Sequence, residues 1–169
     1  MRLNLKDIIH VPGASLPFEF QLDLSHLDFF GTKPLVNPLR VSGIVRNTAS
    51  VLRLEGEAAA TIRLVCDRCT RPFEAEKTVL LDTVLAAELE DEENDEMVLL
   101  DKGGLDLSEL AMTAFVLSME AKHLCSENCK GICPSCGTDL NETSCQCKPM
   151  ADPRFAALAQ LLEQSNQEE

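Results

Sequence analysis

Residues 125–147 read C-S-E-N-C-K-G-I-C-P-S-C-G-T-D-L-N-E-T-S-C-Q-C, and this stretch holds six of the eight cysteines of the chain. The other two lie far upstream, in the C-D-R-C segment Cys66–Cys69. Eight thiols complete two tetrahedral sites with none left over, and Cys133–Gly137 (C-P-S-C-G) has the spacing of a zinc knuckle. The sequence therefore predicts two Zn²⁺ ions. The predicted ligands are Cys66, Cys69, Cys125, Cys129, Cys133, Cys136, Cys145 and Cys147.

Three other uses of the cysteines remain as weaker alternatives. A disulfide framework is typical of small secreted chains, but residues 1–7 contain no apolar segment of a signal peptide. A thiol-redox pair needs a strand-to-helix context, and Cys66 instead follows a predicted strand and precedes Arg71-Pro72, which starts no helix. An iron–sulfur cluster also uses four thiolates, although the C-P-x-C-G form favours zinc.

Composition limits the class of protein. A chain of 169 residues predicts one domain with an appended module, and its apolar runs are too short to span a bilayer, which predicts a cytoplasmic protein. The net charge of −13 argues against nucleic acid as a partner. Residues 40–77, however, hold seven bases against five acids, so this region could approach phosphate. An ordinary mixed-charge strand surface explains the same count.

Alternating apolar and polar residues predict strands over 16–24, 39–46, 52–64 and 73–85, with a short strand over 97–100. A strand or a short helical turn is predicted over residues 1–11. A loop is predicted over residues 27–38 and a turn over residues 47–50. Phe29 and Phe30 are expected to pin that loop to the core, with base stacking as the alternative. Gly56, inside the longest strand, suggests a bulge or bend.

Two helices are predicted. The first begins with Asp106 as N-cap and Glu109 as its capping-box partner, and it runs to about residue 121, mostly buried against the sheet. Its expected apolar stripe consists of Leu107, Leu110, Ala111, Ala114 and Leu117. The second begins at Asp152-Pro153. Between the strands, residues 88–96 hold seven acids, which predicts a solvated loop, with a carboxylate metal site as the alternative.

Together these elements predict an α+β fold. An antiparallel β-sheet, partly open and barrel-like, carries one packed helix, followed by a C-terminal cysteine-rich zinc module and a short terminal helix. The predicted division is residues 1–124 for the sheet and helix, 125–148 for the zinc module packed on it, and 149–169 for the terminal helix and tail.

The order and spacing of these motifs resemble the YceD family of large-ribosomal-RNA-subunit accumulation proteins. The resemblance covers nearly the whole chain and rests on Cys66–Cys69, Cys125–Gly137, Leu140-Asn141, Cys145–Cys147 and the P-R-F segment Pro153–Phe155. It implies a bacterial or plastid ribosome-biogenesis protein needed for accumulation of large-subunit (23S) ribosomal RNA, acting by binding the RNA or its precursor particle. No catalytic activity belongs to the family pattern.

The resemblance also implies how the ligands divide, because some family members keep C-x-R-C and lack the later C-x-x-C and C-x-C. Cys66 and Cys69 would then join Cys125 and Cys129, and the remaining four cysteines would form the second site. The rival pairing exchanges Cys125 and Cys129 with Cys133 and Cys136, and spacing does not exclude it. RNA contact is expected near the first site. The expected residues are Arg68, Arg71, Lys122, His123 and Lys130.

Two other classes of function compete with RNA binding. In the first, zinc is purely structural and an acidic surface docks a basic ribosomal protein, which the net charge of −13 favours. The second is an enzyme. A catalytic zinc keeps an open position, whereas all eight thiolates can be used in closed sites. His10, His26 and His123 are scattered without a catalytic arrangement, so no enzyme is predicted.

Overall fold

The structure is a computed structural model, and it describes residues 1–29, 31–49, 51–86 and 97–147. The chain forms two compact units. The first comprises residues 1–65 and 72–123, and the second comprises the turn Cys66–Arg71 together with the chain from Leu124 onward. The first two cysteines therefore belong to the same unit as the later six, although about fifty-five residues of chain separate them. The three-part division given above stays a prediction.

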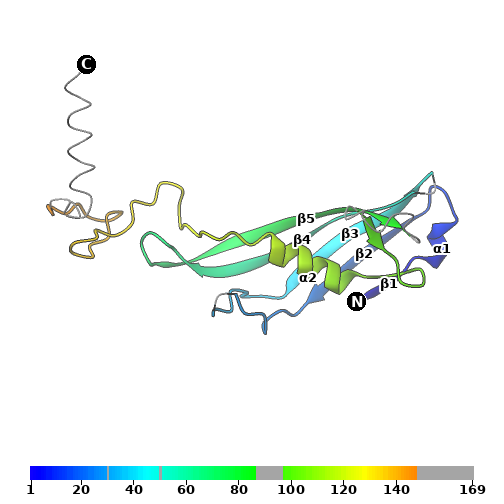
Figure 1. The fold of residues 1–169 in the computed structure, drawn as a ribbon, viewed down its shortest axis with the longest axis horizontal. Coiled ribbons are helices and arrows are strands. Elements are labelled where there is room, and N and C mark those ends of the chain that lie inside the picture. The colour runs from blue at the N-terminus through cyan, green and yellow to red at the C-terminus, as the bar shows by residue number, and fades with distance from the viewer. Residues whose placement is uncertain (30, 50, 87–96, 148–169) are drawn as a thin grey trace, which may run out of the picture. The chain divides into compact units, whose positions relative to one another are not determined.

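The first unit is built on an open, mixed five-stranded sheet in the order β2-β3-β4-β5-β6 (Figure 1). Neighbouring strands are antiparallel except for the parallel pair β5 and β6. Their bounds are β2 Ser15–Leu22, β3 Leu39–Thr48, β4 Val51–Val65, β5 Pro72–Ala86 and β6 Met97–Leu99. A separate antiparallel pair joins β1, Arg2–Asn4, to β7, Gly104–Asp106, and the helices are α1, Lys6–Ile9, and α2, Leu107–Leu117. This confirms the predicted α+β fold, and the sheet is not a closed barrel.

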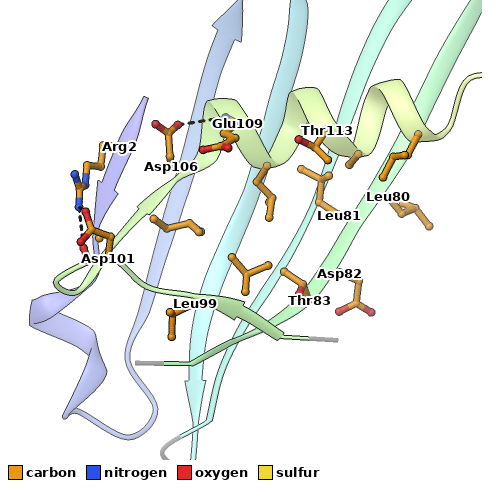
Figure 2. A pocket seen from close by; sticks show the side chains of 16 residues that line it. Arg2, Leu80, Leu81, Asp82, Thr83, Leu99, Asp101, Asp106, Glu109 and Thr113 are labelled. Carbon is orange, nitrogen blue, oxygen red and sulfur yellow. Dashed lines mark hydrogen bonds and ion pairs between the residues drawn. The ribbon is translucent and has the colours of Figure 1, made fainter. Parts of the chain in front are cut away.

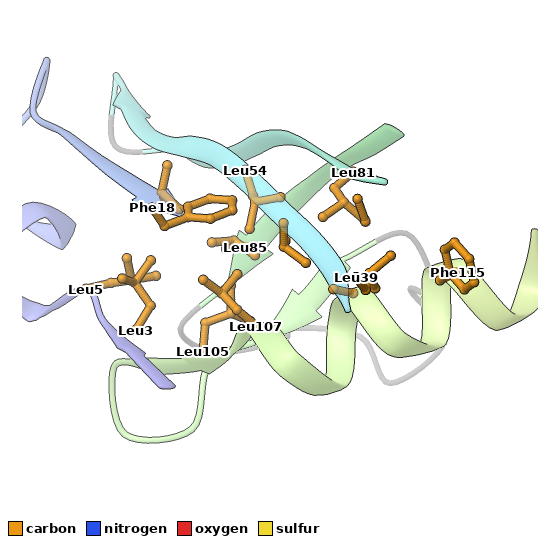
Figure 3. Packing of buried hydrophobic residues seen from close by; sticks show 14 of the residues in the cluster. Leu3, Leu5, Phe18, Leu39, Leu54, Leu81, Leu85, Leu105, Leu107 and Phe115 are labelled. Carbon is orange, nitrogen blue, oxygen red and sulfur yellow. The ribbon is translucent and has the colours of Figure 1, made fainter. Parts of the chain in front are cut away.

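The core lies between one face of the sheet and α2. Along β4 the even-numbered side chains Leu52, Leu54 and Ile62 are buried while Arg53 and Glu55 are exposed, as the period of two predicts. Figure 3 shows Phe115 of α2 close to Leu39 of β3, with Leu54, Leu81 and Leu85 from the neighbouring strands. Burial of this face is the main favourable contribution to the stability of the unit.

The bulge suggested for Gly56 is absent. The pairing of β4 with β3 and with β5 runs unbroken through Gly56, which lies directly opposite Gly43. The reason for the two glycines is close approach. A Cβ at Gly43 would lie 2.4 Å from the carbonyl oxygen of Glu55 and 2.6 Å from Cζ of Phe18, and a Cβ at Gly56 would lie 3.2 Å from the same Cζ. The phenyl ring of Phe18 therefore occupies the space that two side chains would need.

Asn47 was predicted in a turn, and the structure places it at the end of β3 instead. Its side chain is only 1% exposed, and its amide nitrogen donates to the carbonyl oxygens of Ile8 and Ile9 at 2.7 and 2.8 Å. These carbonyls belong to the last turn of α1, and that of Ile8 also accepts from the backbone N–H of Val11 at 3.2 Å. The turn itself begins at Ala49, which has a φ of 52°. Asn47 thus joins α1 to the sheet.

Helix α2 begins as predicted, because the Asp106 carboxylate accepts hydrogen bonds from the backbone N–H groups of Ser108 and Glu109. It ends at Leu117 with Ser118 as C-cap, several residues before the predicted end. The buried seam is Leu107, Ala111 and Phe115. Leu117 was expected in this seam but is 79% exposed, because the seam follows the four-residue spacing from Leu107 and Leu117 falls outside it.

The loop predicted over residues 27–38 is confirmed in part as extended chain beside β4. Leu35 bridges to Ile62, and the backbone N–H of Arg63 donates to the carbonyl of Pro34 at 2.7 Å. Phe29 is half-buried and bridges to Thr32. Phe30, the acidic run 88–96 and the helix predicted from Asp152 lie outside the described residues. Within the described ranges, no helix is long and apolar enough to cross a membrane.

The packing of the Phe18 ring predicts the outcome of adding one methyl group. Gly43→Ala should lower the free energy of unfolding by about 1–3 kcal/mol, because neither the Glu55 carbonyl nor the ring can move away without disturbing the sheet. Chemical denaturation followed by circular dichroism measures this. The neighbouring change Ser42→Ala is the control and should stay within about 0.5 kcal/mol of the parent. Equal stability of the two variants would contradict the packing described here.

Candidate metal centre

The second unit gathers the eight cysteines into two groups. The first group contains Cys66, Cys69, Cys125 and Cys129, and the second contains Cys133, Cys136, Cys145 and Cys147. Within each group the four Sγ atoms all lie within 4.8 Å of one another. This is the grouping that the family resemblance implied. That the thiols ligate a metal stays a prediction.

The first two cysteines lie on a tight turn at the end of β4. The backbone N–H of Thr70 donates to the carbonyl of Cys66 at 2.8 Å, and the N–H of Cys66 donates to the carbonyl of Arg71, also at 2.8 Å. Thr70 has a φ of 60°, in the left-handed region that β-branched residues rarely adopt. The turn brings Cys66 and Cys69 to one side, so both thiols reach the same point in space.

The same turn recurs in the second group. The N–H of Gly137 donates to the carbonyl of Cys133 at 2.8 Å, and the N–H of Cys133 donates to the carbonyl of Thr138 at 2.8 Å. Gly137 has a φ of 73°, and at this position glycine adopts it without steric cost. C-D-R-C-T and C-P-S-C-G are thus two copies of one hydrogen-bonded knuckle, although only the second has the expected glycine.

The sulfur geometry fits zinc. Cys66 Sγ lies 3.8 Å from Cys129 Sγ, and Cys69 Sγ lies 3.6 Å from Cys125 Sγ. A tetrahedron with zinc–sulfur bonds of about 2.3 Å has sulfur–sulfur edges of about 3.8 Å, so these spacings match a four-thiolate zinc site. Cys66, Cys69 and Cys129 are buried, which would shield such a site from water. Four sulfur ligands fill the tetrahedron, so the arrangement favours a structural metal over a catalytic one.

The electrostatics of the thiols also suit a cation. Burial alone would raise the pKa of Cys66, but backbone N–H groups of Cys125, Cys69 and Arg68 outweigh it and lower this pKa to about 6. In the second group, the N–H groups of Cys136 and Ser135 likewise lower the pKa of Cys133 to about 6.

Within each group, one thiol strongly resists ionisation because other thiols stand beside it. Contact with the side chain of Cys69 raises the pKa of Cys125 to about 12, and contact with Cys136 raises the pKa of Cys147 to about 12. Four negative sulfurs cannot share so small a volume unless a positive ion balances them. A divalent cation would do so in either group.

Arg68 is a structural residue of the first knuckle. Its Nη1 donates to the carbonyl of Cys129 at 2.9 Å and to that of Glu127 at 3.3 Å. Its own carbonyl accepts from the N–H of Ile132 at 3.1 Å. A Cβ on Gly131, whose φ is 76°, would lie 2.9 Å from this carbonyl oxygen, so the close approach needs glycine. Arg68 thereby holds the K-G-I segment that joins the two sulfur groups.

Arg71 is held by two acids of the same unit. Its guanidinium lies 2.6 Å from a carboxylate oxygen of Asp139 and 2.6 Å from one of Glu142. These two charges, that of Asp139 first, raise the pKa of Arg71. The pKa of Asp139 is lowered, first by the backbone N–H of Asn141 and also by Arg71. The positive charge of Arg71 is therefore largely balanced inside the unit.

Asn141 organises the first sulfur group, a role that the sequence analysis did not assign. Its Nδ2 donates to Cys129 Sγ at 3.4 Å and to Asp139 Oδ1 at 2.7 Å, and its Oδ1 accepts from the N–H of Lys130 at 2.7 Å. A donor to a ligand sulfur orients it and stabilises its negative charge. The available signal was its place in Leu140-Asn141, one of the motifs that supported the family resemblance.

The five candidate RNA-binding residues divide between the two units. Arg68, Arg71 and Lys130 belong to the second unit, and Lys122 and His123 belong to the first. Lys130 follows Cys129, whose carbonyl accepts from Arg68, so the backbone of Lys130 lies near the Arg68 guanidinium. Lys122 and Lys130 are exposed, and neither forms an ion pair with a described residue. His123 is half-buried and already has a partner. Contact of any of the five with RNA stays a prediction.

Comparison with known proteins gives a family and a few distant relatives. A maize protein named large ribosomal RNA subunit accumulation protein YCED homolog 1, chloroplastic, is 28% identical over 180 residues, covering 88% of this chain and 61% of the relative. Proteins of Mycobacterium bovis and Mycobacterium tuberculosis, both titled uncharacterized, are 28% identical over 122 residues, covering 70% of this chain and 59% of theirs. The chain thus spans about three fifths of the length of these relatives.

No solved structure matches the chain. The profile of the family described as large ribosomal RNA subunit accumulation protein YceD matches residues 54–162. That range is more than half of the chain, and it contains both knuckles, all eight cysteines and Asn141. The chain therefore belongs to the YceD family of large ribosomal RNA subunit accumulation proteins.

Proposed function

We propose that this protein is a zinc-binding ribosome-biogenesis factor of the cytoplasm. It promotes accumulation or processing of large-subunit (23S) ribosomal RNA by binding that RNA or its precursor particle. The single observation that supports this most is the family match across residues 54–162. The name of the maize relative points the same way. Neither name denotes an enzyme class, and we propose no catalytic activity.

Zinc would supply the folding energy of the second unit. Residues 124–147 are all described and contain no helix or strand, and only Cys129, Gly131 and Cys133 are buried there. So little burial cannot offset the entropy of ordering the chain. Cys66, Cys69, Cys125 and Cys129 would hold one ion, and the other four cysteines the second. When bound, each ion cross-links its four thiolates and stabilises their charge.

RNA contact would use Arg68 and Lys130. The Nη1 of Arg68 is engaged by two carbonyls, which leaves its other N–H groups to donate to phosphate, and Lys130 provides an exposed ammonium group nearby. Arg71 is a poorer candidate because Asp139 and Glu142 balance its charge. Affinity should be modest, since the chain as a whole is acidic, and it should fall with rising salt.

A second candidate is a protein-interaction module that docks a basic ribosomal protein. The charge of the second unit favours it. Its described residues contain three bases against four acids, and each zinc with four thiolates would add a charge of −2. A partner with many lysines and arginines would gain from this field, whereas RNA would have to approach through the local Arg68 and Lys130 surface.

Metal analysis tests the two sites. Purified protein should contain two zinc ions per chain. Cys69→Ala and Cys136→Ala should each remove one zinc ion, because each deletes a ligand from a different group. Mass spectrometry of the metal content gives the stoichiometry, and the visible spectrum of the cobalt-substituted protein reports the sulfur ligands.

Ser135→Ala is the matched control, since it lies inside the second knuckle without a ligand atom, and it should keep both ions. Chelation should unfold the second unit while the β-sheet signal in circular dichroism remains. Iron in place of zinc, one ion per chain, or loss of both ions from either cysteine variant would each show the assignment to be wrong.

Ultraviolet crosslinking in growing cells, followed by sequencing of the attached RNA, tests the proposed function. Crosslinks should concentrate in large-subunit ribosomal RNA. In vitro, Lys130→Glu should weaken binding to a 23S transcript severalfold and lower the dependence on salt by about one phosphate contact, because it reverses a charge at the proposed surface.

Lys33→Glu, an exposed lysine in the loop before β3, is the charge-matched control and should bind as the parent does. Both variants should retain two zinc ions, which separates RNA contact from folding. Co-sedimentation with subunit precursors in the absence of RNA crosslinks would favour the protein-interaction module instead. Association of neither kind would contradict both candidates.

A further inference from the structure

The first unit contains a hollow of about 640 Å³ that neither zinc nor RNA binding uses. Figure 2 shows it between α2 and the segment of β6, with residues of β5 along it. The lining from β5 is Leu80, Leu81, Asp82 and Thr83. Every lining residue belongs to the first unit.

The hollow runs along the edge of β5 and is not confined to one face of the sheet. Successive side chains of a strand point to opposite faces, and in β5 Leu81 is buried while Leu80 is 79% exposed. Four successive residues include side chains from both faces, so a hollow that all four line must lie beside the edge of the strand. β6 pairs with β5 only at Val84–Ala86, so among the described residues no strand lies beside Leu80–Thr83.

The backbone of β5 presents hydrogen-bonding groups to this hollow. The carbonyl of Ala86 accepts from the N–H of Leu100 at 2.8 Å, so the backbone groups of Ala86 point away from β4. In a strand, the N–H and C=O of one residue point to the same side, and alternate residues share that side. Leu80 and Asp82 therefore present N–H and C=O groups outward, where an added strand would pair with them.

The side chains around the hollow are leucines with an acidic border. Leu80 and Leu117 are each 79% exposed and Leu99 is 53% exposed, which is unusual for side chains gathered in one place. The charged lining residues are Arg2, Asp82, Asp101, Asp106 and Glu109, four acids against one base. Arg2 pairs with Asp101 and Arg53 pairs with Asp82, whereas Glu109 forms no ion pair among the described residues.

We propose that this hollow binds an extended cationic segment of a partner protein, which adds as a strand to β5 at Leu80–Thr83, along the edge away from β4, where no described strand lies. Backbone pairing with Leu80 and Asp82 would give affinity, the leucines would receive aliphatic side chains, and the acids would select lysine or arginine. Four acids against one base in the lining favour a cationic occupant. This site stands independently of zinc and RNA binding.

A peptide of about eight residues that alternates lysine with valine and contains one tryptophan is the probe. The full chain has no tryptophan or tyrosine, so the probe's fluorescence reports binding alone. In two further peptides, alternate backbone amides carry N-methyl groups. One peptide is methylated along one edge of the strand that it would form, and the other along the opposite edge. A strand pairs through one edge only, so one methylated peptide should bind as the parent does and the other should bind about tenfold more weakly.

Glu109→Lys should weaken binding about fivefold or more, and Leu117→Lys should weaken it similarly, since both place a positive charge at the site. Glu57→Lys makes the same substitution, and Val51→Lys likewise replaces an apolar side chain by lysine, at exposed positions of β4 outside the lining, and both variants should bind as the parent does. Circular dichroism checks that each variant is folded.

Several results would overturn the proposal. Loss of binding with both methylated peptides would mean that the occupant is not a strand, and equal weakening by Glu57→Lys would mean that the charge effect is not local. An alternating glutamate–valine peptide that binds as well would remove the charge argument. Binding of the probe only after the seven acids of residues 88–96 are replaced by serine would show that the chain's own segment occupies the site. No binding at all would also overturn the proposal.

Discussion

The unbroken antiparallel register between β4 and β5 is the constraint on which the rest of the structure depends. It runs from Leu52 opposite Leu85 to Val65 opposite Pro72 without a bulge. Because each residue has a fixed partner, the buried parity of β4 determines which side chains of β5 face the core, and a shift of one residue would turn the core outward. The same register leaves residues 66–71 as the connection, so the first knuckle must form within that short turn.

The second unit depends on charge balance more than on burial. The backbone N–H groups that lower the pKa of Cys133 come from its own knuckle, and two of the three that act on Cys66, those of Cys69 and Arg68, come from the first knuckle, so the turn that positions these thiols also prepares them for a cation. Arg71 also connects two segments of this unit. It follows the first knuckle directly and pairs with Asp139 and Glu142, so the segment between the second knuckle and Cys145 is tied to the first turn. Because these two acids balance its charge, Arg71 has little net charge left to attract a nucleic acid.

Most of the fold could be predicted from the sequence because the strands alternate clearly and Asp106 has the chemistry of an N-cap. The failures have a common cause, which is tertiary contact that local patterns do not encode. Gly56 has the appearance of a bulge until the ring of Phe18 is seen to occupy its space. Asn47 belongs to a turn by residue type, yet the carbonyls of α1 hold it at the end of a strand. The site followed the same rule: cysteine spacing indicated the candidate ligands, but the hydrogen bond from Asn141 to Cys129 Sγ required the three-dimensional structure.

The negative charge of the chain has a different consequence in each of the two units. In the second unit, metal-bound thiolates would add negative charge beside Arg68 and Lys130, so the cations there first offset the metal sites before they meet any partner. In the first unit, the acids border exposed leucines and a strand edge that no described strand covers. An exposed edge of this kind invites aggregation unless charge protects it. Carboxylates repel other copies of an acidic chain while they attract a cationic strand, so a single charge pattern would both prevent self-association and select the partner.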